Sequence, residues 1–218
     1  MEIHIATVGL TKEPILQGVN AYPIDKLILL HSNDDKSKEN SHEIASAVKE
    51  LKIECEIAEV DAFDLEDVLI SIMNIHKKYA QEDLSINLTG GTKVMASAAL
   101  LAGYILGLRV YYIQDGSIDK NKGKYIKERT IELPVPRVNI HDLEQTQKDI
   151  LSYIFKEGGR LEKANTVLHE VLKITKQNAS YHLKQLTKKD LISLTIDGRN
   201  KIVKLTNTGK LFARIFSK

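Results

Sequence analysis

The segment with the clearest chemical potential runs from Ser85 to Lys93 and reads Ser-Ile-Asn-Leu-Thr-Gly-Gly-Thr-Lys. A short apolar strand leads into two glycines, which permit a tight turn, and a long apolar helix then begins. The free amides at the start of that helix favour an anion above the carboxyl end of the strand. Thr89 and Thr92 add hydroxyl donors, and Lys93 adds a positive charge. The pattern predicts a phosphate-binding loop formed by Thr89, Gly90, Gly91, Thr92 and Lys93, with a plain strand–helix turn as the alternative.

The glycines follow neither of the common nucleotide-binding patterns. The chain contains no GxxxxGK[ST] spacing and no GxGxxG fingerprint. Its seven histidines show no metal-ligand spacing with cysteine or carboxylate partners. The sequence therefore predicts no metal site, no cofactor and no catalytic centre of a metalloenzyme or common hydrolase.

Composition limits the class of protein. The 218 residues are 43% apolar, which is enough for packed cores in one large domain or two small ones. The single cysteine, Cys55, excludes an internal disulfide framework and suggests a reducing compartment. No signal peptide opens the sequence, and its longest apolar run, Val94–Leu108, is too short to span a bilayer. We expect a soluble, cytoplasmic protein.

Charge divides the chain into two parts. Residues 1–136 contain 15 Lys/Arg and 21 Asp/Glu, whereas residues 137–218 contain 16 Lys/Arg and 8 Asp/Glu. Such an asymmetry suggests two modules with different partners, and the basic module is the candidate for nucleic-acid binding. The stiff segment Leu133-Pro134-Val135-Pro136 separates them, because residues before proline avoid the helical region.

The first module alternates strand and helix signals. The expected strands are 3–8, 26–30, 54–60, 84–88 and 109–113, followed by 125–133 as an antiparallel hairpin strand. The expected helices are 15–20, 41–51, 64–79 and 92–106, with Ser41 and Asp64 as N-caps. This order predicts an α/β fold, a Rossmann-like and mostly parallel sheet with helices on both faces.

Ligands of such sheets bind beyond the carboxyl ends of the strands. The loop after the first strand supplies Gly9 and Thr11, and weaker candidates at other strand ends are His31, Ser32, Gln114 and Asp115. The helix that begins at Thr92 is apolar nearly all round, which indicates burial on more than one side. Either its own domain covers it or a second copy of the chain does.

The second module has the pattern of a winged helix-turn-helix domain. Two amphipathic helices precede a short break at 173–175, and a third helix, capped by Thr175, has polar and basic residues on its outer face. A hairpin with the turn signal Asp197-Gly198 and a last helix capped by Thr206 follow. His182 lies on the inner face of the third helix. The predicted DNA contacts are Gln177, Asn178, Ser180, Tyr181, Lys184, Gln185, Lys188, Arg199 and Lys201. A helical protein-interaction domain is the alternative.

A parallel-sheet domain with a strand–Thr-Gly-Gly-Thr-Lys–helix element, followed by a winged helix, resembles the archaeal CARF (CRISPR-associated Rossmann fold) regulators. Leu88–Lys93 matches the GGT[KR] signature of that family, and Val8–Thr11 suits its second conserved site. The resemblance implies a homodimer that binds a cyclic oligoadenylate, such as cyclic tetra-adenylate, across its two-fold axis. It also implies that Thr89–Lys93 hold phosphate and ribose while Gly9 and Thr11 close the side of the site.

The resemblance implies a transcription regulator of CRISPR antiviral defence, in which residues 1–136 sense the ligand and dimerise and residues 137–218 bind double-stranded DNA. Some CARF proteins are ring nucleases that cleave their ligand without metal, and Lys93 with Thr11 or Thr92 would suit that activity. A regulator that senses another anionic metabolite outside CRISPR immunity is the third reading.

Overall fold

The computed structural model describes residues 1–114, 116, 124–136, 138, 140–197 and 200–217. The chain forms two compact units, Met1–Val135 and Pro136–Lys218, which are described separately below. The wing-tip residues Gly198 and Arg199 and the strand-end candidate Asp115 lie outside the described residues. No helix of the described ranges is long and apolar enough to cross a membrane.

The first unit is built on one sheet. Its strands are β1 (Glu2–Val8), β2 (Lys26–His31), β3 (Glu54–Glu59), β4 (Asp83–Asn87), β5 (Arg109–Ile113) and β6 (Thr130–Leu133), in the spatial order β3-β2-β1-β4-β5-β6. Strands β1 to β5 are parallel and β6 runs antiparallel to β5. This arrangement confirms the predicted Rossmann-like, mostly parallel sheet.

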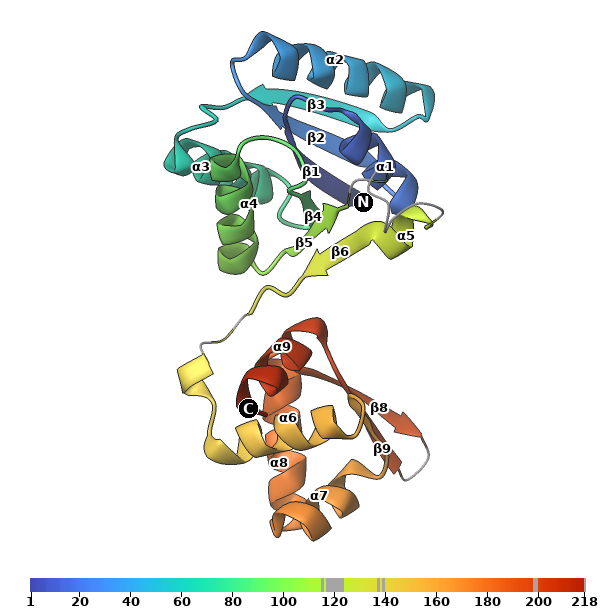
Figure 1. The fold of residues 1–218 in the computed structure, drawn as a ribbon, viewed down its shortest axis with the longest axis vertical. Helices are drawn as coiled ribbons and strands as arrows, with labels where there is room; N and C mark the ends of the chain where they lie inside the picture. Colours follow the sequence, from blue (N-terminus) through green and yellow to red (C-terminus); the bar gives the residue numbers. More distant parts are fainter. Residues whose placement is uncertain (115, 117–123, 137, 139, 198–199, 218) are drawn as a thin grey trace. The chain divides into compact units, whose positions relative to one another are not determined.

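Helices cover both faces of this sheet (Figure 1). They are α1 (Glu13–Ala21), α2 (Asp35–Glu50), α3 (Leu65–Lys78), α4 (Lys93–Leu106) and the short α5 (Ile126–Arg129). Alternate residues of the central strands divide between two cores. Ile3 and Ile5 of β1 pack in the core that contains α3 and α4, whereas Ala6 and Val8 pack with α1 and α2. Burial on both faces explains why the central strands have almost no polar alternation.

Two elements differ from their predicted bounds. Helix α2 begins at Asp35, and Asp34 is its N-cap, accepting the amides of Lys36 and Ser37. Ser41, the predicted cap, is buried in mid-helix and donates to the Ser37 carbonyl oxygen. The predicted strand 125–133 contains α5, and only Thr130–Leu133 pairs with β5. At both places a helical turn consists largely of charged and polar residues, so there was no apolar periodicity to indicate a helix.

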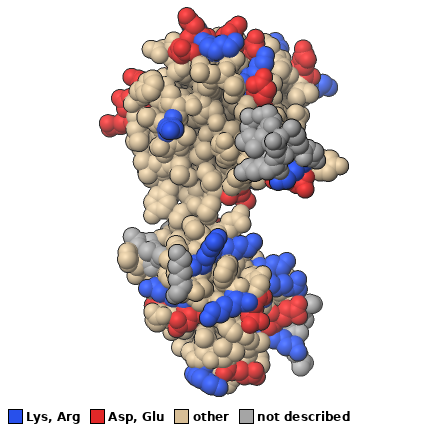
Figure 2. Space-filling view, viewed as in Figure 1, with Lys and Arg blue, Asp and Glu red and all other residues tan. Residues whose placement is uncertain are grey.

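Helix α4 is less buried than its composition predicted. Its inner side packs closely on β5, since a Cβ on Gly103 would lie 2.2 Å from Val110 Cγ2. Its outer side is exposed in a single chain, with exposed fractions of 37–51% at four large apolar residues, Leu100, Leu101, Tyr104 and Ile105. Figure 2 shows a largely uncharged surface where Figure 1 places this helix. The unit therefore covers one side of α4 only.

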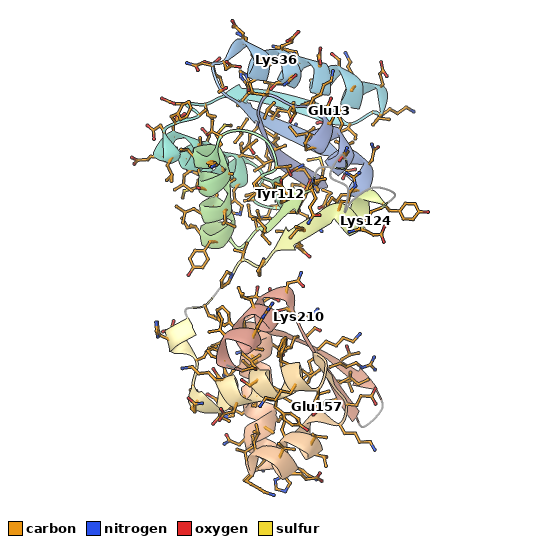
Figure 3. All side chains as sticks on the ribbon, viewed as in Figure 1. Glu13, Lys36, Tyr112, Lys124, Glu157 and Lys210 are labelled. Carbon is orange, nitrogen blue, oxygen red and sulfur yellow. The ribbon has the colours of Figure 1, made fainter. Side chains whose placement is uncertain are left out.

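Strand β5 is buried at Val110, Tyr111 and Ile113, and its exposed side chains are Arg109 and Tyr112. Tyr112, labelled in Figure 3, is 37% exposed. Arg109 at the start of the strand places its guanidinium 4.9 Å from the ring centroid of Tyr22.

The second unit combines helices with a small antiparallel sheet. Its elements in order are the 3-10 turn η2 (Ile140–Asp142), α6 (Gln145–Lys156), β7 (Arg160–Leu161), α7 (Ala164–Leu172), α8 (Lys176–Lys188), β8 (Ile192–Asp197), β9 (Asn200–Leu205) and α9 (Asn207–Phe216). The strands have the order β7-β9-β8. The predicted sequence of three helices, a hairpin and a last helix is present, with the added short strand β7.

Candidate functional site

The glycine loop lies at the point where the strand order of the sheet reverses. Strand β1 lies between β2 and β4, and the chain leaves β3 at one edge to return beside β1 as β4. The loops after β1 and β4 therefore diverge toward opposite faces, which opens the crevice where ligands of such sheets bind. The Thr89–Lys93 segment lies at this position, between β4 and α4.

The two loops contact each other through backbone atoms, which requires glycine. A Cβ on Gly90 would lie 2.3 Å from the Thr7 carbonyl oxygen, and one on Gly9 would lie 2.6 Å from the Gly91 nitrogen. Gly91 has a φ of +81°, in the left-handed region that L side chains rarely adopt. The structure therefore brings Gly9, Gly90 and Gly91 together, and leaves no side chain between the loops.

The hydroxyls of Thr89 and Thr92 already have partners within the unit. Thr89 Oγ1 donates to Asn87 Oδ1 over 2.6 Å and accepts the Ile113 amide over 2.9 Å. Thr92 Oγ1 donates to the Ala62 carbonyl oxygen over 2.6 Å and accepts the Met95 amide as the N-cap of α4. Each hydroxyl has one proton, so neither is free to donate to a phosphate here. Their predicted contact with a ligand stays a prediction.

The free donors at this site are backbone amides and one ammonium. The described part of the chain provides no acceptor for the amides of Gly91, Thr92, Lys93 and Val94, which open helix α4. Such amides carry the positive end of the helix dipole and are ordinary anion ligands. The Lys93 side chain is exposed and forms no ion pair with a described residue. The loop thus concentrates positive potential, and the carboxylates of the turn bonded to Thr92, Asp61 and Asp64, accept backbone amides of their own segment.

The loop after β1 is held by polar side chains of α2. Ser37 Oγ donates to the Val8 carbonyl oxygen over 3.0 Å and Asn40 Nδ2 donates to that of Gly9 over 2.9 Å. Both side chains are almost fully buried. Thr11 lies in the same loop and is exposed, so its hydroxyl is accessible beside the glycine contact. Thr11 was predicted at the site, whereas Ser37 and Asn40 were not, because their spacing does not differ from that of an ordinary polar helix face.

The weaker strand-end candidates take part in the fold itself. His31 is buried, and its Nδ1 lies 2.6 Å from the Ser32 carbonyl oxygen. The Ser32 amide donates to Ser37 Oγ over 3.3 Å. The Gln114 amide donates to the Arg129 carbonyl oxygen, and the Gln114 carbonyl oxygen accepts from Arg129 Nη1 over 3.2 Å.

Three further residues near the site were missed from the sequence. Thr7 is fully buried in β1 and donates its hydroxyl to the Gly90 carbonyl oxygen over 2.7 Å. Asn87 accepts both the amide and the hydroxyl of Thr89. Arg129 is 8% exposed, and its Nε has no hydrogen-bond partner among the residues that the structure describes. Asn87 could have been found, because a polar residue interrupts an apolar strand directly before the glycines.

A buried polar cluster lies deeper in the same unit. His4 Nδ1 lies 2.7 Å from the Tyr111 hydroxyl, and its Nε2 lies 3.1 Å from Glu2 Oε1. Burial lowers the pKa of His4 to about 4, because the imidazolium loses its hydration, and Glu2 opposes that shift only in part. Burial likewise raises the pKa of Tyr111. Both groups are therefore neutral near pH 7.

Helix α8 of the second unit presents the predicted DNA-contacting residues on one side. Its inner residues Ala179, His182, Leu183 and Leu186 are buried, and Thr175 caps the helix by accepting the Asn178 amide over 3.1 Å. The outer residues Gln177, Asn178, Tyr181, Lys184 and Lys188 are exposed, whereas Ser180 and Gln185 are half-buried. This helix follows α7 after a turn at 173–175.

Two of the predicted DNA-contacting residues, Lys201 and Ser180, join the hairpin of β8 and β9 to α8. Lys201 Nζ of β9 donates to Ser180 Oγ of α8 over 2.8 Å. The bond places an ammonium from the hairpin directly against the outer side of α8. Figure 2 shows further Lys and Arg side chains over this unit, with fewer Asp and Glu side chains among them. Lys210 of α9, labelled in Figure 3, is one of these basic residues.

Comparison with known proteins gives relatives and similar folds. A protein of Archaeoglobus fulgidus, described as uncharacterized, is 24% identical over 227 residues that cover 98% of each chain. Csm6 of Enterococcus italicus bound to cyclic hexa-2'-fluoro-hexa-dAMP has a similar fold, with a TM-score of 0.51 and 14% identity over 86% of this chain and 54% of that one. Can2 of Sulfobacillus thermosulfidooxidans in complex with cyclic tetra-adenylate gives a TM-score of 0.49 and 15% identity over 100% of this chain.

The chain spans 64% of the length of Can2 and 54% of that of Csm6, so each of those proteins has parts without a counterpart here. Among the described residues, no group of three or more His, Cys, Asp or Glu side chains is arranged to hold a metal ion. The family model described as "HFX_2341_N:-like, N-terminal" matches residues 2–118, which include every strand and helix around the glycine loop. That match covers more than half of the sequence, and the chain belongs to this family.

Proposed function

We propose that this protein is a homodimeric, CARF-type transcription regulator that senses a cyclic oligoadenylate and adjusts its binding to double-stranded DNA. The observation that carries the proposal is the contact between Gly9 and the Gly90–Gly91 turn at the switch point of the sheet. Beside this contact, the backbone amides at the start of α4 and the exposed Lys93 ammonium are the groups that would bind an anion. Phosphodiesters are anions that such a site favours.

The fold supports a cyclic ligand. The first unit has the same kind of Rossmann-like sheet as Csm6, which binds a cyclic hexanucleotide analogue. A ring with several equivalent phosphates suits two copies of one loop that face each other across a two-fold axis. Cyclic oligoadenylate fits this symmetry better than a mononucleotide, which has one phosphate group for one loop.

The exposed side of α4 supports a dimer. Leu100, Leu101, Tyr104 and Ile105 form an apolar stripe on a helix whose first turn is part of the ligand site. Exposed apolar stripes of this kind mark protein–protein interfaces. A second copy packed on α4 would bring the two ligand loops toward one another, so binding the ring would change the relative position of the two subunits.

The second unit supports DNA binding through a winged helix-turn-helix domain. Helix α8 has exposed polar and basic residues on one side, and Lys201 joins it to the hairpin of β8 and β9. Such a helix fits the major groove, while the hairpin contacts phosphates. Residues 137–218 have 16 Lys/Arg against 8 Asp/Glu, and this charge favours a polyanion.

Calorimetric titration of the full chain with cyclic tetra-adenylate and cyclic hexa-adenylate tests the sensor. Lys93→Ala should weaken binding roughly tenfold or more, because a charged hydrogen bond is lost. Lys36→Ala is the matched control, since Lys36 is an exposed lysine of the first turn of α2, paired with Glu39. Unchanged affinity in Lys93→Ala would remove Lys93 from the site, and no binding of either ring to the wild type would refute the sensor proposal.

The same mixtures separate sensing from cleavage. Chromatography of the ligand after incubation without metal should recover the intact ring if the protein only senses it. Linear oligoadenylate that depends on active protein would favour a ring nuclease instead. Binding of another anionic metabolite, with none of cyclic oligoadenylate, would favour a regulator outside CRISPR immunity.

A further inference from the structure

Phe63 is an exposed aromatic residue in the turn between β3 and α3. Its side chain is 80% exposed, while its neighbour Ala62 is 3% exposed. Single exposed apolar side chains are common on protein surfaces and need no explanation. The position of Phe63 relative to the glycine loop is what sets it apart.

The turn that carries Phe63 is rigidly held. Asp61 Oδ1 accepts the Phe63 amide over 2.9 Å, and the Asp61 carbonyl oxygen accepts the Asp64 amide over 3.1 Å. The Asp61 amide in turn donates to Asp67 Oδ2 over 2.8 Å. These bonds hold the backbone of Phe63, so binding a ligand at this turn needs little ordering of the main chain.

The same turn is tied to the start of α4. The Thr92 hydroxyl donates to the Ala62 carbonyl oxygen over 2.6 Å. Phe63 directly follows Ala62, and consecutive Cα atoms lie about 3.8 Å apart. The exposed aromatic residue therefore follows directly on a residue that is bonded to Thr92, the N-cap of the helix at the glycine loop.

A second exposed apolar residue directly follows another residue in contact with that loop. Leu10 is 70% exposed and directly follows Gly9, whose backbone is in contact with Gly91. Leu10 and Phe63 thus each follow a residue that contacts the glycine loop, Gly9 on the β1 loop and Ala62 on the β3 loop. Exposed apolar surface beside anion-binding groups suits a ligand that has an apolar part as well as a charge.

We propose that Phe63 is a base-stacking residue of the ligand site, and that it makes the site prefer phosphodiesters with a flat nucleobase over phosphates without one. This inference rests on the proposed function and adds a specificity-determining residue to it. A nucleotide joins an anion to an aromatic ring, and proteins bind single-stranded nucleic acids through the same pair of features, positive groups for the backbone and aromatic side chains for the bases.

Three variants isolate the contribution of the Phe63 aromatic ring to ligand affinity. Phe63→Ala removes it, Phe63→Leu keeps an apolar side chain without a flat face, and Phe63→Tyr keeps the aromatic face. Stacking on one base accounts for roughly 5- to 150-fold in affinity. We expect Phe63→Ala to bind cyclic tetra-adenylate or cyclic hexa-adenylate more weakly by that factor, Phe63→Leu to be intermediate, and Phe63→Tyr to match the wild type. Tripolyphosphate, a probe with phosphates and no base, should bind all four proteins equally.

Each outcome bears on a different statement. If the wild type binds neither ring, the proposed function fails and this inference fails with it. If the wild type binds one of the cyclic oligoadenylates and Phe63→Ala binds it equally well, only the inference about Phe63 is overturned. Sedimentation at the concentrations of the titration gives the last control: loss of the dimer in Phe63→Ala would assign Phe63 to subunit contact and overturn its role in stacking.

Discussion

The Thr7 hydroxyl donates a hydrogen bond to the Gly90 carbonyl oxygen over 2.7 Å, although 83 residues separate the two in sequence. Thr7 is fully buried in β1, and Gly90 belongs to the turn between β4 and α4. The bond therefore fixes the glycine turn against the neighbouring strand. A ligand loop that is held in this way needs little rearrangement when it binds.

Thr7→Val should loosen this turn. The substitution keeps the shape of the side chain and removes the donor, which leaves the buried Gly90 carbonyl oxygen unpaired at a cost of about 1–3 kcal/mol. Urea unfolding followed by circular dichroism measures the loss of stability, and calorimetry measures a weaker affinity for cyclic oligoadenylate. Thr7→Ser, which keeps the hydroxyl, should stay within about 1 kcal/mol of the wild type. Equal stability of the valine and serine variants would contradict the role of the bond.

Gly90→Ala should disrupt the site more strongly. Its Cβ would lie 2.3 Å from the Thr7 carbonyl oxygen, a backbone atom of a central strand that cannot move aside. We expect a loss of stability on the order of 1–3 kcal/mol and a loss of ligand binding. Gly158→Ala is the control, because no heavy atom of the described residues lies within 4 Å of a Cβ at this position, although Gly158, unlike Gly90, has a positive φ of +78°. It should cost about 1 kcal/mol through backbone strain and leave ligand affinity unchanged. A Gly90→Ala protein that binds normally would show that the two loops are free to separate.

A charge on the outer side of α4 should separate the proposed dimer. Tyr104→Glu places a carboxylate in the exposed apolar stripe, where burial against a second copy would strip its hydration. Sedimentation velocity should then report a monomer at concentrations where the wild type is a dimer. Lys49→Glu changes an exposed residue of α2, on the opposite face of the sheet, and should leave the dimer intact. A monomeric wild type would refute the dimer directly.

Lys184→Ala should change the salt dependence of DNA binding. Each lysine that neutralises a phosphate contributes about 0.9 to the slope of log affinity against log salt concentration. We expect the slope for a duplex of random sequence to decrease by about that amount, because the electrostatic contribution is independent of sequence. Lys36→Ala, in the first unit, removes one positive charge and should leave the slope as it is. Fluorescence anisotropy measures both, and an unchanged slope for Lys184→Ala would place α8 away from the DNA backbone.

Stability of the first unit should fall as the solution is acidified from about pH 6.5 to pH 4. The pKa of His4 is lowered to about 4 by burial, against 6.5 for an ordinary histidine. Between these values the unfolded chain binds a proton that the folded chain does not, so stability increases with pH across this window, by on the order of 3 kcal/mol in total. His4→Gln should flatten that dependence in urea unfolding measured at several pH values. The control is His42→Gln, at an exposed site on α2, which should leave the pH dependence of stability unchanged. If His4→Gln shows the same pH dependence of stability as the wild type, His4 is not the source of that dependence.

Local chemistry was enough to predict most elements of this protein. Long apolar segments alternate with amphipathic ones in the first unit, and that pattern specifies a parallel sheet with helices on both faces. Caps at Asp64, Thr175 and Thr206 were visible because a hydroxyl or carboxylate precedes each helix. The start of α2 was not visible in the sequence, because the charged residues between Asp34 and Asn40 give no apolar periodicity.

The glycine loop itself was also visible in the sequence, as two glycines, two threonines and a lysine between a strand and a helix. Which of these groups is free to bind was decided by the tertiary structure. Thr89 donates its single hydroxyl proton to Asn87, and Thr92 donates its own to the Ala62 carbonyl oxygen. The Gly90 carbonyl oxygen accepts from Thr7, so it is occupied as well. The sequence alone determined the kinds of group at the site, because residue type sets charge and hydrogen-bonding capacity. Their availability depended on strand order, because only the packing of β4 beside β1 brings residues 83 positions apart within hydrogen-bond distance.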